Sequence, residues 1–228
     1  MHTHDKKQEL KTEGRTIPWA RFYDALGWIV TFGGIRHTQK RMLDAIDLQH
    51  GEYVLDVGCG TGTLAISAKQ KYGKDIEIQG IDASQQMINV AQAKASKAGV
   101  EVDFQTGLIE DLPFQENHFD KVLNTLVFHH LPQDLQRRGL KEIFRVLKPG
   151  GWLVIVDMQS SPGGFGQRLS DLFINLHGGH KHMADNVSKL QPLLDSAGFE
   201  DVNSESLDRQ FAVINGRKPS IQDSTHHA

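Results

Sequence analysis

The spacing of apolar residues changes along this chain from a helical repeat to short runs typical of strands. Between about Pro18 and Leu48, bulky side chains recur at helix-like intervals, although Gly33-Gly34 interrupts the pattern. From about residue 53 onward, short aliphatic and β-branched runs alternate with longer stretches of helical spacing. This alternation predicts a parallel sheet whose strands are joined by right-handed helical crossovers.

Serine, proline and glycine positions set the expected limits of these elements. Ser84 is expected to cap a helix, and Pro132 to stand just inside the start of another. Gly99 and the segment 149–151 are expected to stop helices. The predicted strands lie near 53–57, 76–81, 100–105, 119–124 and 152–157, with helices near 62–72, 84–98 and 133–147 between them.

The two ends of the chain differ from this alternating middle. Residues 1 to about 15 are charged and lack apolar periodicity, which predicts a mobile tail before the helical segment. After Pro162 we expect a glycine-rich loop, then a helix over Val187–Ala197 that Gly198 ends. Two final strands are expected near 201–207 and 211–215.

The run Asp56-Val57-Gly58-Cys59-Gly60-Thr61-Gly62-Thr63 joins the first predicted strand to the following helix. Glycines let the backbone approach a ligand closely, because no Cβ intervenes and positive φ is accessible. A dinucleotide-binding turn needs a small residue at the last position of Gly-x-Gly-x-x-Gly, where Thr63 stands here. Asp56 would repel a diphosphate but attract an ammonium group. The turn therefore predicts a nucleotide-like cofactor that carries a cation.

These residues resemble the first motif of class I methyltransferases that use S-adenosylmethionine. The resemblance continues as far as Asp157 through an ordered series of segments, and this makes it much more specific than a lone glycine turn. The branch that the chain resembles includes the ubiquinone and menaquinone biosynthesis methyltransferases, which act on small molecules. The further segments are Gly80-Ile81-Asp82-Ala83-Ser84, Leu112-Pro113-Phe114, Phe119-Asp120, His129-His130-Leu131 and Arg145-Val146-Leu147-Lys148-Pro149-Gly150-Gly151.

The resemblance implies a Rossmann-like, doubly wound α/β fold with a seven-stranded sheet. This sheet is expected to be mostly parallel, with one antiparallel strand in the C-terminal hairpin. Residues 1–50 would form an N-terminal tail and helical cap, and residues 51–228 the cofactor-binding core, with a substrate lid near 160–186. The glycine pairs at 163–164 and 178–179 could act as hinges of that lid, and a polar surface loop is the alternative.

Position and chemistry assign most of the expected cofactor site. The glycines of the turn would let its backbone pass beneath the methionyl part, while Asp56 favours the ammonium group directly or through water. Asp82, at the end of the second strand, is placed to accept hydrogen bonds from the two ribose hydroxyls. Resemblance adds Ala83 and Met87 beside the ribose and adenine, although helix core is an equal alternative for Met87. The expected cofactor-binding residues so far are Asp56, Gly58, Gly60, Gly62, Asp82, Ala83, Met87 and Asn124.

One position departs from the family pattern. Members often carry Gly-Asp-Ala-Glu before the Leu-Pro-Phe segment, with the aspartate near the adenine amino group, whereas this chain has Gly107-Leu108-Ile109-Glu110. A leucine side chain cannot accept that hydrogen bond. A backbone carbonyl, Glu110 or Asp111 could take over, or apolar contact could hold the adenine. We expect a backbone carbonyl together with packing of Leu108, and we expect Glu110 and Asp111 to be solvated loop acids.

His129 and His130 follow the fourth predicted strand, at the sheet edge where the reactive methyl group should point. Imidazole suits a base near neutral pH, so both histidines are candidate catalytic bases for a protic acceptor. A sulfonium already activates its methyl group, so alignment without a base is the alternative. In that case at least one of the two histidines shapes the substrate site or the structure.

The histidines at His177, His180 and His182 invite a metal-binding interpretation, which we reject. Their spacing matches no helical His-Glu-x-x-His arrangement, no cysteine joins them, and Lys181 adds like charge. We predict no metal site and assign this loop to the substrate lid.

Aromatic residues of the N-terminal helical segment could have a functional or a structural role. They could roof the cofactor and form an apolar acceptor pocket, or they could dock the helix on the sheet. Docking is expected for most of them, while the Tyr23 hydroxyl is expected to reach the methionyl carboxylate of the cofactor. The segment 26–32 could touch a membrane surface, but it is too short and too weakly basic to anchor the chain. These aromatic residues are Trp19, Phe22, Tyr23 and Trp28.

Composition and charge restrict the classes of binding partner and the cellular compartment that we expect. A chain of 228 residues suits one α/β domain, and a formal net charge of −3 disfavours non-specific binding of nucleic acid. One cysteine excludes an intrachain disulfide and a cysteine-based zinc cluster, and it fits a reducing compartment. The polar N-terminus lacks the apolar stretch of a signal peptide, and no run is long enough to span a bilayer. A cytoplasmic location is expected.

Together these observations predict an enzyme that moves a methyl group from S-adenosylmethionine to oxygen, nitrogen or carbon of a small-molecule acceptor, apolar or aromatic. We expect neither a nucleic-acid partner nor a stable membrane anchor, and the oligomeric state is not encoded in these patterns. A cofactor-binding but non-catalytic regulatory module is the first alternative, because of Leu108 and the lack of an unambiguous base. A nicotinamide-dependent oxidoreductase is the second, disfavoured by Asp56 and Thr63.

Overall fold

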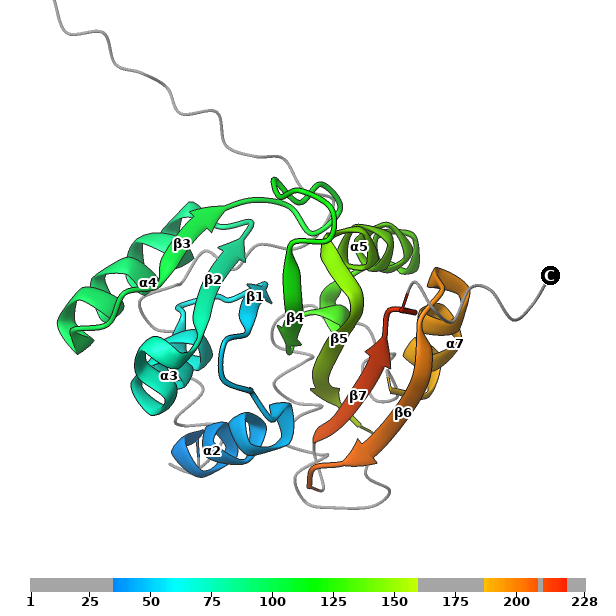
Figure 1. Cartoon of the computed structure of the whole chain (residues 1–228), viewed down its shortest axis with the longest axis horizontal. Helices are drawn as coiled ribbons and strands as arrows, with labels where there is room; N and C mark the ends of the chain where they lie inside the picture. The colour runs from blue at the N-terminus through cyan, green and yellow to red at the C-terminus, as the bar shows by residue number, and fades with distance from the viewer. Residues whose placement is uncertain (1–34, 160–186, 209–210, 221–228) are drawn as a thin grey trace, which may run out of the picture.

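The computed structural model describes residues 35–159, 187–208 and 211–220, and its centre is a seven-stranded sheet (Figure 1). The strand order is β3-β2-β1-β4-β5-β7-β6, so the sheet grows outward in both directions from β1 and β4. Neighbouring strands are parallel, except that β7 runs antiparallel to both β5 and β6. This confirms the predicted fold class. The strands are β1 (Tyr53–Val57), β2 (Glu77–Asp82), β3 (Asp103–Thr106), β4 (Phe119–Thr125), β5 (Leu147–Met158), β6 (Glu200–Ser206) and β7 (Phe211–Arg217).

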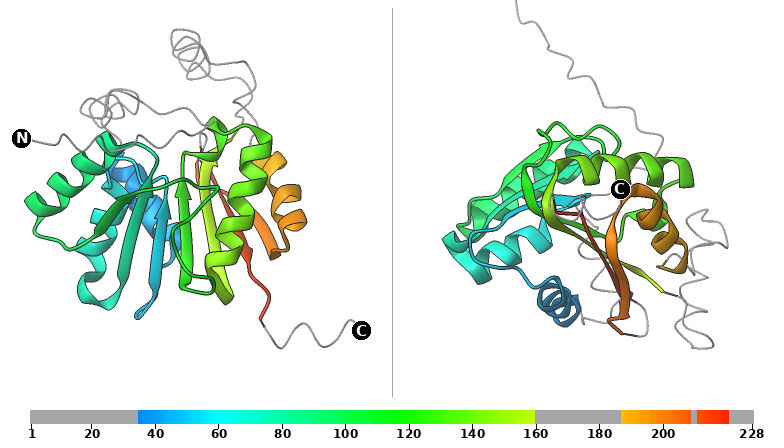
Figure 2. Two further views of the ribbon diagram at one scale, coloured as in Figure 1. Left: turned by 90° about the horizontal axis from the view of Figure 1, so that it is seen from above. Right: turned by 45° about the vertical axis from the view of Figure 1, so that its right-hand side comes forward.

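Helices cover both faces of the sheet. On one face lie α2 (Ile35–Ile46), α3 (Thr63–Tyr72) and α4 (Gln85–Ala98), and on the other α5 (Gln133–Val146) and α7 (Val187–Ala197). Figure 2 (left) shows α5 in front of the sheet and α2 behind it. Because both faces are covered, the central strands β1 and β4 are mostly buried, and every residue of β1 after its first is buried.

Most predicted boundaries agree with the structure to within one or two residues. Ser84 caps α4 by accepting a hydrogen bond from the Met87 backbone N–H at 3.4 Å, and Gly99 ends that helix with a φ of 68°. Pro132 stands one position earlier than predicted, as the N-cap of α5. β3 begins at Asp103, later than its predicted start.

The segment 149–151 does not stop a helix, because α5 already ends at Val146 and β5 begins at the next residue. Leu147 pairs with Phe119 and Trp152 pairs with Lys121, so the extra residues of β5 form a bulge between these pairs. Gly150 adopts a φ of 80° there, and its N–H donates to the carbonyl of Lys218 at 2.9 Å. The predicted role was wrong, because this glycine's positive φ serves a bulge inside a strand.

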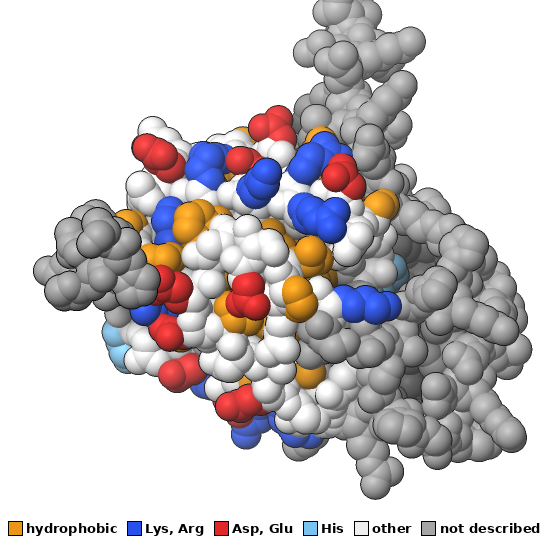
Figure 3. Space-filling view, turned by 90° about the vertical axis from the view of Figure 1, so that its right-hand side faces the viewer, with side chains coloured by type: hydrophobic (Ala, Val, Ile, Leu, Met, Phe, Trp, Pro, Cys, Tyr) orange, Lys and Arg blue, Asp and Glu red, His pale blue; other side chains and the backbone are white. Residues whose placement is uncertain are grey.

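The outer strand β6 carries mostly exposed, polar residues. Figure 3 shows the side of the molecule to which β6 and α7 belong, and over its described part positive and negative side chains are interspersed. A charged and solvated edge strand is poorly suited to pair with a second chain.

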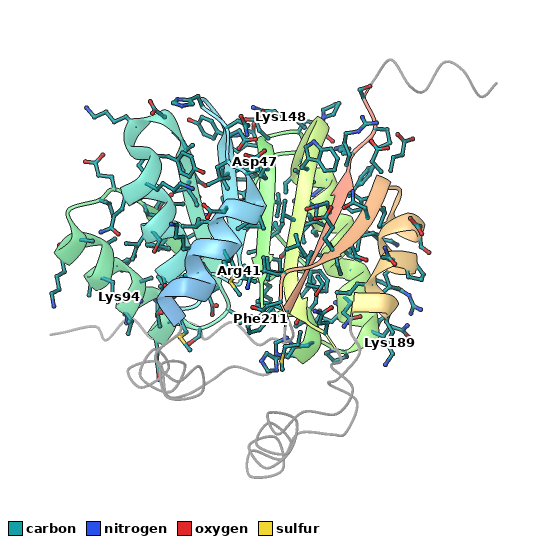
Figure 4. All side chains as sticks on the ribbon, turned by 90° about the horizontal axis from the view of Figure 1, so that it is seen from below. Arg41, Asp47, Lys94, Lys148, Lys189 and Phe211 are labelled. Atoms are coloured by element: carbon teal, nitrogen blue, oxygen red, sulfur yellow. The ribbon has the colours of Figure 1, made fainter. Side chains whose placement is uncertain are left out.

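A buried lysine attaches α2 to the sheet. Lys121 of β4 is 6% exposed, and its Nζ donates to the carbonyl oxygens of Ile46 and Asp47 at 3.2 and 2.7 Å, where α2 ends. The same atom lies 3.1 Å from Oε1 of Glu52. Asp47 and Lys148 are at the same end of the sheet in Figure 4. A cation in this position satisfies carbonyls that lack helical partners and complements the helix dipole.

We expect Lys121→Met to lower the free energy of unfolding by about 3 kcal/mol, because the half-buried carboxylate of Glu52 and two carbonyls at the end of α2 lose this partner. Urea denaturation at pH 7 measures the loss. Lys148→Met is the matched control: Lys148 pairs with Asp120 at 2.8 Å, but both side chains are at least a third exposed. That change should cost less than about 1 kcal/mol. Equal losses in the two variants would contradict the anchoring role of Lys121.

Candidate functional site

A glycine turn connects β1 to α3 at the carboxyl edge of the sheet. Gly58, Gly60 and Gly62 have φ values of 76°, 53° and 72°, a region that disfavours residues with a Cβ. A Cβ at Gly58 would lie 2.4 Å from Cγ2 of Val127, and one at Gly62 would lie 2.5 Å from the Phe104 ring. A Cβ at Gly60 would meet no atom within 4 Å. Two of the glycines are therefore needed for packing, whereas the backbone at Gly60 borders open space.

The turn is held against the end of β2 by its own N–H groups. Gly58 and Cys59 donate to the carbonyl of Ile81 at 2.7 and 3.0 Å, and Gly60 donates to Oδ2 of Asp82 at 3.0 Å. The other carboxylate oxygen of Asp82 accepts the Ser84 N–H at 2.8 Å. The end of β2 thus fixes both the glycine turn and the first residues that lead into α4.

Asp82 keeps acceptor capacity after making these contacts. Each oxygen of an ionised carboxylate can accept more than one hydrogen bond, and only one backbone donor is seen on each oxygen. Burial raises the pKa of Asp82, while the hydrogen bonds from Ser84 and Gly60 act in the opposite direction. The side chain is partly exposed at the carboxyl edge of the sheet, where ligands of open α/β sheets bind.

Asp56, the residue of β1 that precedes Val57, is the least satisfied polar group of the described core. It is fully buried, and neither of its carboxylate oxygens has a hydrogen-bond partner among the described residues. Burial, and then the negative charge of Asp82, raise the pKa of Asp56 to about 7. Two buried acceptors without donors fit a group that brings N–H donors and positive charge, such as the ammonium of S-adenosylmethionine, directly or through an ordered water.

The other predicted cofactor residues lie at the same edge but differ in their surroundings. Asn124 is fully buried near the end of β4, where Nδ2 donates to the Val57 carbonyl at 2.8 Å and Oδ1 has no described partner. Met87 is buried in the first turn of α4, and Ala83 is half-buried just before that helix. Leu108 is half-buried and forms an isolated bridge with Asp111.

The two acids after Leu108 behave differently from each other. Asp111 is exposed, as predicted for a solvated loop acid. Glu110 is half-buried, and its Oε2 is buried without a described hydrogen-bond partner. The prediction for Glu110 was therefore wrong, because packing of the loop covers one oxygen of this side chain.

The Leu112-Pro113-Phe114 segment is fixed to α5 by charged side chains. Arg145 donates to the carbonyls of Phe114 and Leu112 at 2.8 and 2.9 Å, and Glu142 accepts the Leu112 N–H at 3.0 Å. The same arginine pairs with Glu142 at 2.7 Å, which lowers the pKa of that glutamate. These contacts join the Leu-Pro-Phe segment to the Arg-Val-Leu segment, which are far apart in the chain.

His129 and His130 lie in the short 3-10 helix η2 (Phe128–His130), which follows β4. Nδ1 of His129 lies 2.6 Å from Oδ1 of Asp157, and the His129 backbone N–H donates to Oδ2 at 3.0 Å. The rings of His129 and His130 are 3.8 Å apart between centroids, at an angle of 47°. The structure therefore brings both histidines to the carboxyl edge and gives His129 a carboxylate partner.

Asp157 was not among the site residues predicted from the sequence. It is fully buried near the end of β5, so η2 supplies one member of the pair and β5 the other. The available signal was an acid at the end of a long apolar strand whose carboxyl end meets the cofactor edge. The contact between residues from different strands is not encoded in local spacing.

Several predicted residues lie outside the described part of the chain. They are Tyr23 and the other N-terminal aromatic residues, and the lid histidines His177, His180 and His182. Within the described ranges, no group of three or more histidine, cysteine or acidic side chains is arranged to hold a metal ion. No helix among the described residues is both long and apolar enough to cross a bilayer.

Comparison with known proteins shows which family this chain resembles. A model described as a methyltransferase domain matches residues 54–151. The chain is 30% identical over 216 residues to demethylmenaquinone methyltransferase of Thermus thermophilus, covering 86% of this chain and 96% of that protein. It is 32% identical over 185 residues, 81% of this chain, to phosphoethanolamine N-methyltransferase of Triticum aestivum, but spans only 35% of that protein's length.

Solved structures share the fold. Human N-acetylserotonin methyltransferase in complex with S-adenosylmethionine matches with a TM-score of 0.68 and 24% identity, over 88% of this chain and 56% of that one. The glycine turn, the acid at the end of β2 and the match to the Thermus thermophilus protein over 86% of this chain point to the same conclusion. The chain belongs to the class I S-adenosylmethionine-dependent methyltransferases.

Proposed function

We propose that this protein transfers a methyl group from S-adenosylmethionine to an oxygen, nitrogen or carbon atom of a small-molecule acceptor. The observation that carries the proposal is Asp56, which stands two positions before the first glycine of the turn. Both of its oxygens are buried and have no donor among the described residues. An apolar core rarely retains such a group, because an unpaired buried carboxylate destabilises the fold. A cationic cofactor would supply the missing partner.

The cofactor would be held by groups on adjacent strand ends. Asp56 would favour the ammonium group, the glycine turn would pass beneath the methionyl part, and Asp82 would accept from the ribose hydroxyls. Bound in this way, the sulfonium supplies a methyl group that is already activated for displacement. The protein's own task is then to align the acceptor and exclude water. The remaining residues of the proposed cofactor site are Tyr23, Ala83, Met87, Leu108 and Asn124.

The acceptor is proposed to be small, apolar or aromatic. The names of two relatives, a demethylmenaquinone methyltransferase and a phosphoethanolamine N-methyltransferase, both specify small acceptors. His129 or His130 would act as general base for a protic acceptor. The alternative, a non-catalytic regulatory module, predicts cofactor binding with no turnover on any member of an acceptor panel.

Calorimetric titration with S-adenosylhomocysteine should show saturable one-to-one binding, and NAD should not bind. Asp82→Ala should weaken binding of S-adenosylhomocysteine by about 10²-fold, because hydrogen bonds to a carboxylate contribute roughly 1.5–3 kcal/mol each. Asp103→Ala, which changes an exposed residue at the first position of β3, is the matched control and should bind normally. Binding of NAD alone would refute the proposal and favour an oxidoreductase.

Asp56→Asn should stabilise the protein and weaken cofactor binding. The folded pKa of Asp56 is about 7 against an ordinary 3.8, so the folded state holds the proton more tightly than the unfolded state. The carboxylate therefore destabilises the fold increasingly as pH rises from about 4 to 7, by on the order of 4 kcal/mol above pH 7.

We expect the asparagine variant to gain at least about 1 kcal/mol in unfolding free energy at pH 8 and clearly less at pH 5, because the carboxyl group is then mostly neutral in the fold. Urea denaturation at both pH values measures the gain. Binding of S-adenosylhomocysteine to the variant should fall by 10-fold or more, because the neutral amide attracts the ammonium less. A gain in unfolding free energy that is the same at both pH values, or unchanged binding of S-adenosylhomocysteine, would argue against the proposed role of the Asp56 carboxylate.

A further inference from the structure

The carboxylate of Asp157, near the end of β5, contacts His129 of η2 through both of its oxygens. Its Oδ1 lies 2.6 Å from Nδ1 of His129, and its Oδ2 accepts the His129 backbone N–H at 3.0 Å. Oδ1 also accepts the N–H of Met158 at 2.7 Å. The Asp157 side chain is fully buried, and that of His129 is 5% exposed. The carboxylate therefore holds His129 at two points, the imidazole through Oδ1 and the backbone N–H through Oδ2.

The contact determines which ring nitrogen of His129 carries the proton. A carboxylate can only accept, so the neutral imidazole must donate from Nδ1, and Nε2 keeps its lone pair. No hydrogen bond to Nε2 is seen among the described residues. A buried imidazole in this tautomer has the arrangement needed to accept a proton at Nε2 while the carboxylate stabilises the resulting imidazolium.

The backbone before His129 is strained and lies against the glycine turn. Leu126, the residue after β4, has a φ of 59°, which is uncommon for a residue with a side chain. Val127, the next residue, packs so closely on Gly58 that a Cβ there would lie 2.4 Å from Cγ2 of the valine. The histidine pair is thus carried by a segment in direct contact with the turn proposed to bind the cofactor.

We propose that Asp157 is a positioning residue, which holds His129 with Nε2 as the proton acceptor, and that His129 rather than His130 is the general base. This inference rests on the proposed methyl transfer and deepens it. The acceptor's lone pair forms a bond to the methyl carbon as the carbon–sulfur bond breaks, and that electron pair stays on sulfur. The acceptor's proton moves to Nε2 of His129, and the imidazolium later returns it to water. The acceptor class is accordingly one whose reacting atom carries a proton that must leave, such as a phenol, a hydroquinone or an amine.

A purely structural role for Asp157 is the competing explanation, because the same carboxylate also accepts two backbone N–H groups. Asp157→Asn separates the two roles by spectroscopy. An amide that keeps its oxygen on the His129 backbone N–H turns its nitrogen toward Nδ1 and the Met158 N–H, so Met158 loses its acceptor and Nδ1 must itself become an acceptor. The ring proton should move to Nε2.

Long-range ¹H–¹⁵N spectra of histidine-labelled protein at pH 8 test this without an acceptor. We expect His129, assigned by its loss in His129→Gln, to be protonated at Nδ1 in the parent protein and at Nε2 in Asp157→Asn. Titration with S-adenosylhomocysteine on the same samples should show binding unchanged within about 3-fold. Lost binding would mean that the change damages the cofactor site and would count against a pure positioning role. An Nε2–H tautomer in the parent protein would overturn the proposal.

Turnover tests the catalytic part, with a phenol, a hydroquinone and phosphoethanolamine as acceptor probes. For any probe that is methylated, His129→Gln should lower kcat about 10²-fold with little change in the KM of the cofactor, and Asp157→Asn should do nearly the same. His118→Gln is the matched control, since His118 packs on Tyr53 and Phe119 next to the first residue of β4, at the opposite end of that strand. Full activity in His129→Gln, or a larger loss in His130→Gln, would overturn the assignment. If no probe is methylated while S-adenosylhomocysteine binds, the proposed catalytic function fails, and the spectra alone decide the tautomer.

Discussion

The hydrogen bonds between the glycine turn and the end of β2 are the interaction on which the site depends. Three successive N–H groups of the turn are directed at two residues, Ile81 and Asp82. This arrangement fixes the turn's backbone without using any side chain of the turn itself. It also commits Asp82 to a fixed orientation at the carboxyl edge of the sheet. A turn fixed in this way can pass beneath a ligand with little loss of conformational entropy on binding.

The same edge of the sheet gathers features that oppose folding. Asp56 is a buried carboxylate without a described partner, and Leu126 holds a positive φ. Contacts elsewhere offset these unfavourable contributions to folding. The Lys121 ammonium has acceptors at the end of α2 and on Glu52, and Arg145 of α5 donates to the carbonyl of Phe114 in a loop. A buried carboxylate without a described partner at one edge, with satisfied polar groups at the other, is the distribution expected when function rather than stability selects the residues.

The strand and helix pattern was predictable because each element is encoded locally, by runs of apolar residues and by caps such as Ser84 and Gly99. The role of the 149–151 segment was not, because a β-bulge depends on the register between β4 and β5 rather than on the glycines themselves. The site divides in the same way. Asp56 and Asp82 follow from their places at strand ends, whereas the His129–Asp157 pair joins residues 28 positions apart, one in η2 and the other in β5. Glu110 was misjudged because burial of a loop side chain depends on how that loop packs.

The acceptor is harder to infer than the cofactor for a related reason. Two relatives of nearly equal identity to this chain, 30% and 32%, carry names with chemically different acceptors, a demethylmenaquinone and a phosphoethanolamine. Similarity in the core therefore cannot choose between them, because the core binds what all of these enzymes share. The proposed base at His129 restricts the acceptor in a different way, since a base is useful only where the reacting group must lose a proton. The proposed role of one histidine would thus restrict the chemistry of the acceptor where the sequence similarity of the core does not.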